Sequence, residues 1–239
     1  MNSLFEKFDT FERNDPEFHE IFKNFAFGEV FENSNLTEKE SILVILASLI
    51  ACQSPKAFKK ILFSALDNDI TPIEVKELLY QSVPYVGFGR AHNFFGVVTK
   101  VFDKKGIGYP LPPQSNTNAE NRYEKGRELQ DKFFGKENIQ MMNDQTPKDQ
   151  QHFNKFLEGY CFGDFYTRDG LNDSQRELIT FVFIASLGGC ENQLRGHTQG
   201  NLSVGNTKEK LISAITVIMP HIGFPRTLNA LAIVNEICG

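Results

Sequence analysis

The amino-acid sequence predicts an all-α fold made of two copies of one helical unit. Two observations support this prediction: the same motifs recur at a nearly constant spacing, and polar segments typical of helix starts precede long apolar runs. The runs Ile42–Cys52 and Leu178–Leu187 are longer than typical strands and rich in Leu and Ala, which indicates buried helices. No long segment alternates polar and apolar residues as a half-buried strand does.

Two pairs of segments establish the repeat. Pro84–Asn93 (PYVGFGRAHN) and Pro220–Asn229 (PHIGFPRTLN) share Pro, Gly, Phe, Arg and Asn at an offset of 136 residues. Upstream, Asn24–Leu36 and Gly159–Leu171 share a Phe-Gly pair and a final Leu at an offset of 135. Because unrelated domains would not keep this register, the sequence indicates an internal duplication.

The helix starts also recur in the two copies. Thr37, with Glu three residues later, forms a capping box before the first apolar run, and Asn172 with Gln three residues later repeats it. Thr71, followed by Pro, starts the next helix of the first copy, and Thr207 does the same in the second. A further helix is expected to start at Cys190, after a tight Gly-Gly turn.

A connector separates the copies. Asp103–Asn118 contains Pro110, Pro112 and Pro113 and is otherwise polar, so we expect an exposed, extended path there and a helix again from Ala119. The predicted organisation is a first repeat at 1–104, a linker at 105–118 and a second repeat at 119–239.

Composition narrows the function classes. The chain has 239 residues, 41% of them hydrophobic and 23% charged, which is ordinary for a globular protein, and its net charge of −5 gives no basic surface for nucleic acid. The N-terminus lacks the apolar segment of a secretory signal, and the apolar runs are about half the length that spans a bilayer. We therefore expect a cytoplasmic protein without a membrane segment.

The four cysteines, Cys52, Cys161, Cys190 and Cys238, form neither a CxxC pair nor a zinc-binding spacing. We expect free thiols and no bound metal.

Residues 122–239 resemble the carboxymuconolactone decarboxylase family of the alkylhydroperoxidase D-like (AhpD-like) superfamily, and 15–102 resemble it more loosely. The matching pieces are YEKG, CFGDFYTRDGL, RELITFVFIASLGG, QLRGHTQGNLSVG and PHIGFPRTLNAL. The resemblance implies two AhpD-like helical units paired as a pseudo-twofold bundle, and a homotrimer of the whole chain. It also implies cofactor-free lyase chemistry on γ-carboxymuconolactone or, in the peroxidase branch, reduction of hydroperoxides by a CxxC pair with a histidine four residues later.

The segment from Cys190 to His197 fits each branch only in part. Where the peroxidases have their second cysteine, this chain has Gln193, so a local dithiol is missing. The decarboxylases commonly have Glu-Leu-x-x-His here, and Gln193 again replaces the acidic residue. A glutamine side chain orients a substrate carboxylate but does not carry a proton at neutral pH.

We interpret His197 as the main catalytic candidate, because histidine titrates in the range that suits general acid–base work. The structural alternative is a histidine packed between helices. Glu177, at the position of the superfamily's relay glutamate, is the second candidate, and its alternative is a capping box with Ser174.

Two more residues carry weaker hypotheses. Cys190 is a possible thiolate nucleophile at a helix start, or an inert buried thiol. Arg195 is a possible ligand for a substrate carboxylate, or part of a solvated helix face.

The first copy lacks this chemistry. Ser54, Ala57 and Ile61 occupy the places of Cys190, Gln193 and His197, and Ser41 or Ile42 that of Glu177. The sequence therefore predicts one site per chain and a first repeat that acts as a scaffold.

Three functions stay open at this point. The leading hypothesis is a decarboxylase-like lyase that uses His197 and Glu177 on a small carboxylate or lactone, without a cofactor. The second is a peroxidase with peroxiredoxin activity through Cys190. The third is a non-catalytic helical oligomeric scaffold. A cavity that brings together Glu177, Cys190 and His197 would favour the first two.

Overall fold

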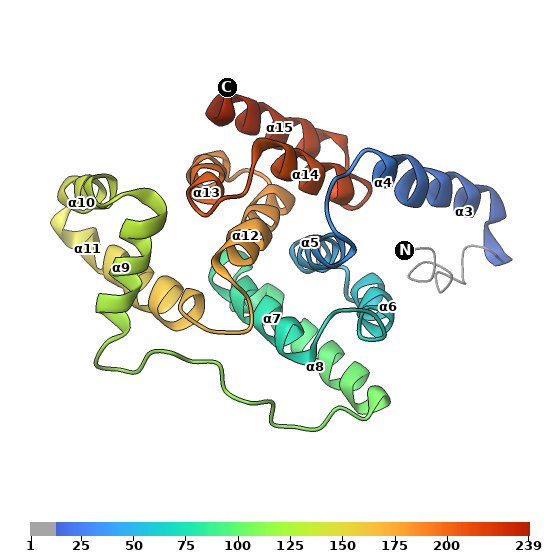
Figure 1. Cartoon of the computed structure of the whole chain (residues 1–239), viewed down its shortest axis with the longest axis horizontal. Coiled ribbons are helices and arrows are strands. Elements are labelled where there is room, and N and C mark those ends of the chain that lie inside the picture. Colours follow the sequence, from blue (N-terminus) through green and yellow to red (C-terminus); the bar gives the residue numbers. More distant parts are fainter. Residues whose placement is uncertain (1–12) are drawn as a thin grey trace.

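The computed structural model describes residues 13–239, and helices are the only regular elements in that range (Figure 1). The first repeat contains α3 (Pro16–Lys23), the π-helix η1 (Asn24–Glu29), α4 (Val30–Glu32), α5 (Glu38–Ala51), α6 (Pro55–Ala65), α7 (Pro72–Val86) and α8 (Phe88–Lys105). The second contains α9 (Arg122–Phe134), α10 (Lys136–Gln145), the short 3-10 helix η2 (Lys148–Gln150), α11 (Gln151–Phe156), the π-helix η3 (Leu157–Tyr166), α12 (Asp173–Leu187), α13 (Glu191–Ser203), α14 (Lys208–Ile222) and α15 (Phe224–Cys238). The predicted all-α fold is confirmed.

The expected helix caps are present. The Thr37 hydroxyl accepts a hydrogen bond from the backbone N–H three residues later at 3.2 Å, and the Asn172 side chain does the same at 2.9 Å. Both complete the capping box predicted from the sequence. Thr71 and Thr207 cap α7 and α14. These side chains fix the same helix starts in both repeats.

The centre of the molecule is formed by α5 and α12, which correspond to each other in the two repeats. Residues 41–51 of α5 and 176–186 of α12 are buried without interruption, which explains why neither helix has a polar face. Helix α5 packs against α12 and α14, whereas α12 packs against α5 and α7. Exchanging the repeats reproduces these contacts, as expected for a pseudo-twofold bundle.

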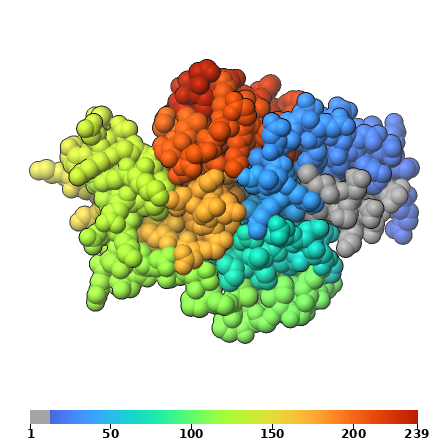
Figure 2. Space-filling view, in the orientation of Figure 1, coloured from blue at the N-terminus to red at the C-terminus, as the bar shows by residue number. Residues whose placement is uncertain are grey.

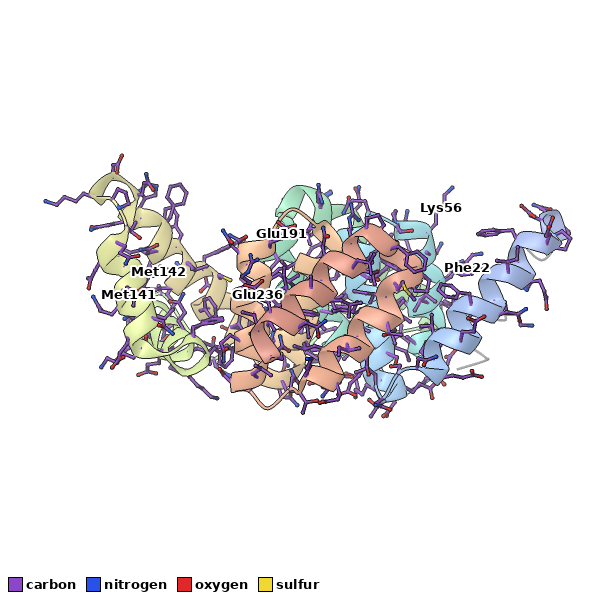
Figure 3. All side chains as sticks on the ribbon, turned by 90° about the horizontal axis from the view of Figure 1, so that it is seen from above. Phe22, Lys56, Met141, Met142, Glu191 and Glu236 are labelled. Atoms are coloured by element: carbon purple, nitrogen blue, oxygen red, sulfur yellow. The ribbon has the colours of Figure 1, made fainter. Side chains whose placement is uncertain are left out.

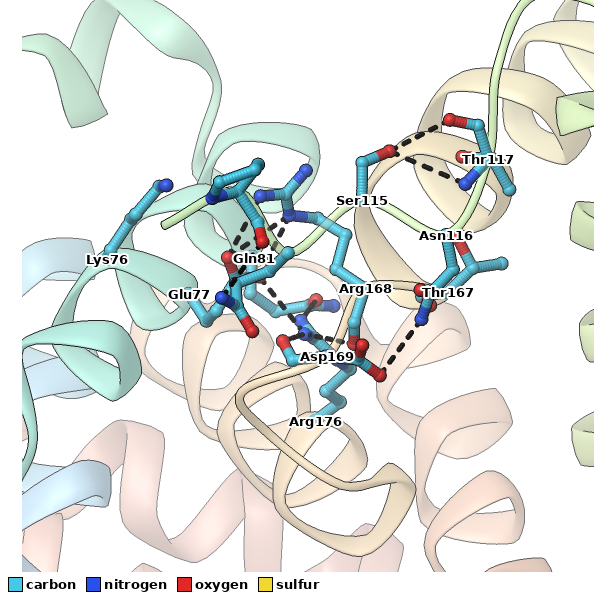
Figure 4. Close-up of polar contacts among 12 residues, drawn as sticks. Lys76, Glu77, Gln81, Ser115, Asn116, Thr117, Thr167, Arg168, Asp169 and Arg176 are labelled. Atoms are coloured by element: carbon cyan, nitrogen blue, oxygen red, sulfur yellow. Dashed lines mark hydrogen bonds and ion pairs between the residues drawn. The ribbon is translucent and has the colours of Figure 1, made fainter. Parts of the chain in front are cut away.

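A buried ion network joins the repeats next to this core (Figure 4). Glu77 of α7 is fully buried and accepts hydrogen bonds from Arg168 Nε at 2.9 Å and Arg176 Nη2 at 3.1 Å. Arg176 also donates to the side chain of Gln81, again on α7, at 3.0 Å. The network fixes α7 of the first repeat against the start of α12 in the second.

The connector runs along the edge of the molecule (Figure 1). Gly106, at φ +67°, ends α8, and residues 107–118 have no regular secondary structure. Helix α9 starts at Arg122, so the expectation of a helix from Ala119 is wrong by three residues. Residues 119–121 form a turn in front of the helix, and the backbone N–H groups of residues 120 and 121 donate to the Asn118 side chain as they would to a helix N-cap.

Helices α9, α10 and α11 form one end of the molecule, opposite α3 (Figure 2). Two glycines of the family-like motifs let α9 lie directly on η3. A Cβ atom on Gly126 would lie 1.9 Å from the carbonyl oxygen of Glu158, and one on Gly163 would lie 2.1 Å from that of Arg122. Neither place has room for a side chain, and the two backbones meet there.

Across residues 13–239, the helices are all too short or too polar to cross a bilayer.

Candidate active site

The second repeat contains a cavity of about 630 Å³, closed on one side by the first repeat. Helix α9, α10, α11 and η3 supply most of its apolar wall, and α7 contributes Pro84 and Tyr85. The large apolar side chains that these four helices supply are Phe134, Ile139, Met142, Phe153, Phe156, Leu157, Tyr160 and Phe162, and α12 adds Ile184 and Leu187. Cys190, Gln193 and His197 line the same cavity, so three of the residues singled out in the sequence lie together there.

His197 and Glu177 form a hydrogen-bonded pair at the back of the cavity. His197 Nδ1 lies 3.0 Å from Oε2 and 3.3 Å from Oε1 of Glu177. Glu177 is fully buried and His197 is 9% exposed. Because an ionised carboxylate only accepts, Nδ1 carries the hydrogen in this contact and Nε2 is left for a ligand.

The turn between the two helices makes this pairing possible. Gly188 and Gly189 both have positive φ, +69° and +72°, which a residue with a side chain rarely adopts. The chain therefore reverses within a few residues, and α13 returns along α12. Asn172 rather than Ser174 caps α12, so Glu177 lies inside the helix and its carboxylate is not used in a cap.

Two tyrosines form a hydrogen-bonded chain that ends on the Glu177 carboxylate. Tyr166 donates to Glu177 Oε1 at 2.8 Å, and the Tyr85 hydroxyl lies 3.1 Å from that of Tyr166. Burial, with the Glu177 charge as a further cause, raises the pKa of both phenols well above the usual 10. Both tyrosines therefore stay protonated, and a chain of donors runs from Tyr85 through Tyr166 to the carboxylate.

Aromatic rings hold the imidazole in place. The ring of Tyr85 meets that of His197 edge to face with centroids 5.3 Å apart, and Phe134 meets it from α9 at 5.5 Å. Tyr85 belongs to the first repeat, so the site is built from both copies. The sequence patterns did not single out Tyr85, Phe134, Tyr166 or the exposed cavity residue Tyr160.

Two of the four thiols line the cavity, and all four cysteines are free. Cys190 is the N-cap residue of α13, as expected, and its thiol lies 3.6 Å from the carbonyl oxygen of Gly188. Cys161 is buried with its sulfur 3.6 Å from the Tyr85 hydroxyl. Burial raises the pKa of Cys161 to about 12, which disfavours a thiolate there.

Of the two residues expected to bind substrate, Gln193 and Arg195, only one lies in the cavity. Gln193 lines the cavity. Arg195 is not part of the wall: its guanidinium donates to Glu236 on α15, with Nε–Oε1 at 2.9 Å and Nη2–Oε2 at 3.0 Å. The place of Arg195 therefore gives no support to a role in binding a carboxylate in this cavity.

The first repeat has no counterpart of this chemistry. The starts of α5 and α12 differ by 135 residues, which places Ile42 at the position of Glu177, and Ile61 stands in α6 at that of His197. Both isoleucines are buried in the core. Between residues 13 and 239, no three His, Cys, Asp or Glu side chains are arranged to hold a metal ion.

Comparison with known proteins gives relatives for both repeats. The model of the carboxymuconolactone decarboxylase family matches residues 16–100 and 151–236. A 4-carboxymuconolactone decarboxylase from Acinetobacter baylyi (strain ATCC 33305 / BD413 / ADP1) is 27% identical over 120 residues, which cover 50% of this chain and 89% of that protein.

A solved structure shares the fold of the whole chain. It is the crystal structure of a protein from Burkholderia xenovorans LB400, provisionally named a gamma-carboxymuconolactone decarboxylase subunit. The TM-score is 0.57 at 19% identity, with 98% of this chain and 93% of that chain covered. Because the family model matches most of both repeats, the chain belongs to the carboxymuconolactone decarboxylase family and carries the family unit twice.

Proposed function

We propose that the protein is a decarboxylase-like lyase that moves protons with His197 and Glu177 on a small carboxylate, lactone or related acid. The observation that carries the proposal is the 3.0 Å contact between His197 Nδ1 and Glu177 Oε2 beside a cavity large enough for a small molecule. The family of the chain supports a decarboxylase-like function.

In the proposed reaction, the bond between the carboxylate carbon and the neighbouring carbon breaks. Carbon dioxide leaves, and the electron pair moves into a conjugated carbonyl group as an enolate. Protonated His197 then gives its Nε2 hydrogen to the carbon, and Glu177 stabilises the charged imidazole before the transfer. The net change is one carboxylate and one proton converted into one C–H bond and carbon dioxide.

The test is one assay applied to the wild-type protein and to two histidine variants. Loss of γ-carboxymuconolactone and of related unsaturated lactone and keto acids is followed by ultraviolet absorbance. His197→Ala should lower the rate by about 10²–10⁴-fold, the usual contribution of a general acid or base. His92→Ala is the matched control, because His92 is exposed on α8 and outside the cavity. Equal rates for His197→Ala and wild type contradict the site assignment.

A second candidate function is reduction of hydroperoxides by Cys190. It is favoured by one observation, a free thiol at the N-cap of α13 that faces the same cavity as His197. The thiolate would attack the peroxide oxygen, release an alcohol and become a sulfenic acid, which an external thiol would reduce. Consumption of an organic hydroperoxide that is lost in Cys190→Ser but kept in Cys238→Ser would establish it.

A non-catalytic scaffold is less well supported, because His197 lines the cavity and is not packed among apolar groups away from it. The homotrimer expected from the family resemblance and the cytoplasmic location stay predictions. Light scattering tests the trimer.

A further inference from the structure

Charged side chains are rare around the cavity beside His197. Among residues 13–239, none that lines it is Lys, Arg, Asp or Glu. Its remaining polar groups are neutral: the amides of Gln130, Asn138 and Gln193, two thiols and two phenols. The site therefore offers a ligand at most one positive charge, on the imidazole.

The arginines of the second repeat that could have supplied a cation are bound elsewhere. Arg195 is paired with Glu236, and Arg168 and Arg176 are paired with Glu77 at the repeat interface. The positive charge that His197 can gain is already balanced by Glu177. Apart from His197, a ligand carboxylate in the cavity meets only neutral hydrogen-bond donors, and a second carboxylate would be buried without a charged partner, which is unfavourable.

The apolar wall continues to the mouth of the cavity. Phe153, Phe156 and Tyr160 line it and are 63%, 57% and 45% exposed. Exposed aromatic residues that continue into a cavity are typical of sites for apolar ligands. The wall is thus suited to a ligand with an uncharged ring or another apolar body.

We propose that the substrate of this site is a monocarboxylic acid with an apolar, aromatic-type body and a carbonyl group β to the carboxylate, and that dicarboxylates are excluded. The proposal rests on the proposed decarboxylation, for which the β-carbonyl accepts the electron pair of the broken C–C bond. The single carboxylate becomes carbon dioxide, so both products, carbon dioxide and the ketone, are uncharged. By this reasoning γ-carboxymuconolactone, which carries two carboxylates, is a poor substrate.

Binding of two inert probes tests the substrate class without relying on turnover. Phenylpropanoate and its para-carboxy derivative share one apolar body and differ by a single carboxylate. In calorimetric titrations of the full chain, the para-carboxy probe should bind about tenfold more weakly, or worse. Equal or tighter binding of the para-carboxy probe overturns the proposal, and so does the absence of measurable binding of phenylpropanoate at millimolar concentration.

Turnover is measured separately with benzoylacetate and its para-carboxy derivative, above their spontaneous rates of decay. Faster loss of benzoylacetate supports the proposed substrate class and the decarboxylation together. If phenylpropanoate is the preferred probe but benzoylacetate decays only spontaneously, the decarboxylation fails while the preference for an apolar monoacid stands. The two proposals can therefore fail independently.

A matched pair of variants locates the preference in the cavity. Met142 is half-buried and lines the wall, whereas its neighbour Met141 is 53% exposed and does not (Figure 3). Met142→Lys places a cation in the wall and should reduce the preference for the monocarboxylate probe by about tenfold. Met141→Lys should leave the preference unchanged. A folded Met142→Lys protein with the wild-type preference contradicts the assignment of this cavity as the binding site.

Discussion

Tyr85 of the first repeat and His197 of the second lie edge to face, with ring centroids 5.3 Å apart. The two residues come from opposite halves of a duplicated chain, and each half contributes site residues that the other lacks. The second repeat has the His197–Glu177 pair, and the first has the phenol whose hydroxyl begins the donor chain to Glu177. The first repeat is therefore part of the site and more than a support for it.

Tyr85→Phe keeps the ring against His197 but removes the hydroxyl. Tyr166 then loses one hydrogen-bond partner, and its own bond to Glu177 is weakened. A single hydrogen bond contributes about 0.5–1.5 kcal/mol, so kcat should fall about two- to tenfold while KM changes little. Tyr80→Phe, on the same helix and outside this donor chain, is the control. Steady-state kinetics that match wild type in Tyr85→Phe would show that the donor chain plays no part.

Glu177→Gln should lower activity less than the loss of His197. The amide keeps a hydrogen-bond acceptor near Nδ1 but cannot supply the negative charge that stabilises the imidazolium as it donates its proton. The value of kcat should therefore fall while KM changes little. Steady-state kinetics measure the loss.

Glu191→Gln serves as the control for that experiment, since Glu191 lies exposed in the first turn of α13, outside the cavity wall. A wild-type kcat in Glu177→Gln would mean that the carboxylate plays no part in the proton transfer.

Most of the fold could be predicted because its signals are local. A capping box such as that at Thr37 involves residues three apart, and the repeat offset needs only the sequence itself. The start of α9 was missed because a turn at residues 119–121, held by the Asn118 side chain, precedes the helix without disturbing the apolar pattern.

The site could be predicted only where it is built from consecutive helices. Glu177 and His197 lie on α12 and α13, and the Gly-Gly turn between them indicates that these helices return on each other. Tyr85 is more than 100 residues from His197 in the chain, and local pattern does not show which helices will meet. One signal was available: within the recurring PYVGFGR and PHIGFPR motifs, Tyr85 is replaced by His221.

His221 makes stability depend on pH. Burial lowers its pKa from 6.5 to about 4, so the folded protein keeps it neutral where the unfolded chain takes up a proton. Stability is therefore lost as pH falls from about 6.5 to about 4, with no further loss from this group below that. Between pH 7 and 4.5, His221→Gln should lose about 1–3 kcal/mol less unfolding free energy than wild type. Urea unfolding at the two pH values measures this, and an identical loss in both proteins would contradict it.

Glu77→Gln should destabilise the contact between the repeats. The change leaves Arg168 and Arg176 beside a neutral amide, and Arg176 has no exposed surface through which water could compensate. Removing one partner of a buried ion pair costs about 3–5 kcal/mol, which should appear as a lower urea midpoint. Glu236→Gln removes an exposed pair and should leave the midpoint unchanged. Similar midpoints for the two variants would show that the buried network contributes little.

Gly200→Ala tests whether the position of the Glu177 carboxylate matters. Gly200 lies on α13 one turn after His197, where the helix passes the carboxylate. A Cβ atom there would lie 2.5 Å from Glu177 Oε2 and 2.9 Å from the ring of Phe134. Because Glu177 is buried and hydrogen-bonded to Tyr166 and His197, it cannot move aside without breaking those contacts.

The variant should lose about 1–3 kcal/mol of unfolding free energy from overpacking, and kcat/KM should fall about tenfold or more because the carboxylate leaves the imidazole. Gly96→Ala on α8 is the matched control: a Cβ atom there meets nothing within 4 Å, so the change should be neutral or stabilise the helix by up to about 1 kcal/mol. Kinetics and urea unfolding of both variants are compared with wild type. A Gly200→Ala protein that is destabilised yet fully active would show that the position of the Glu177 carboxylate does not affect catalysis. Glu177 would then have a structural role only.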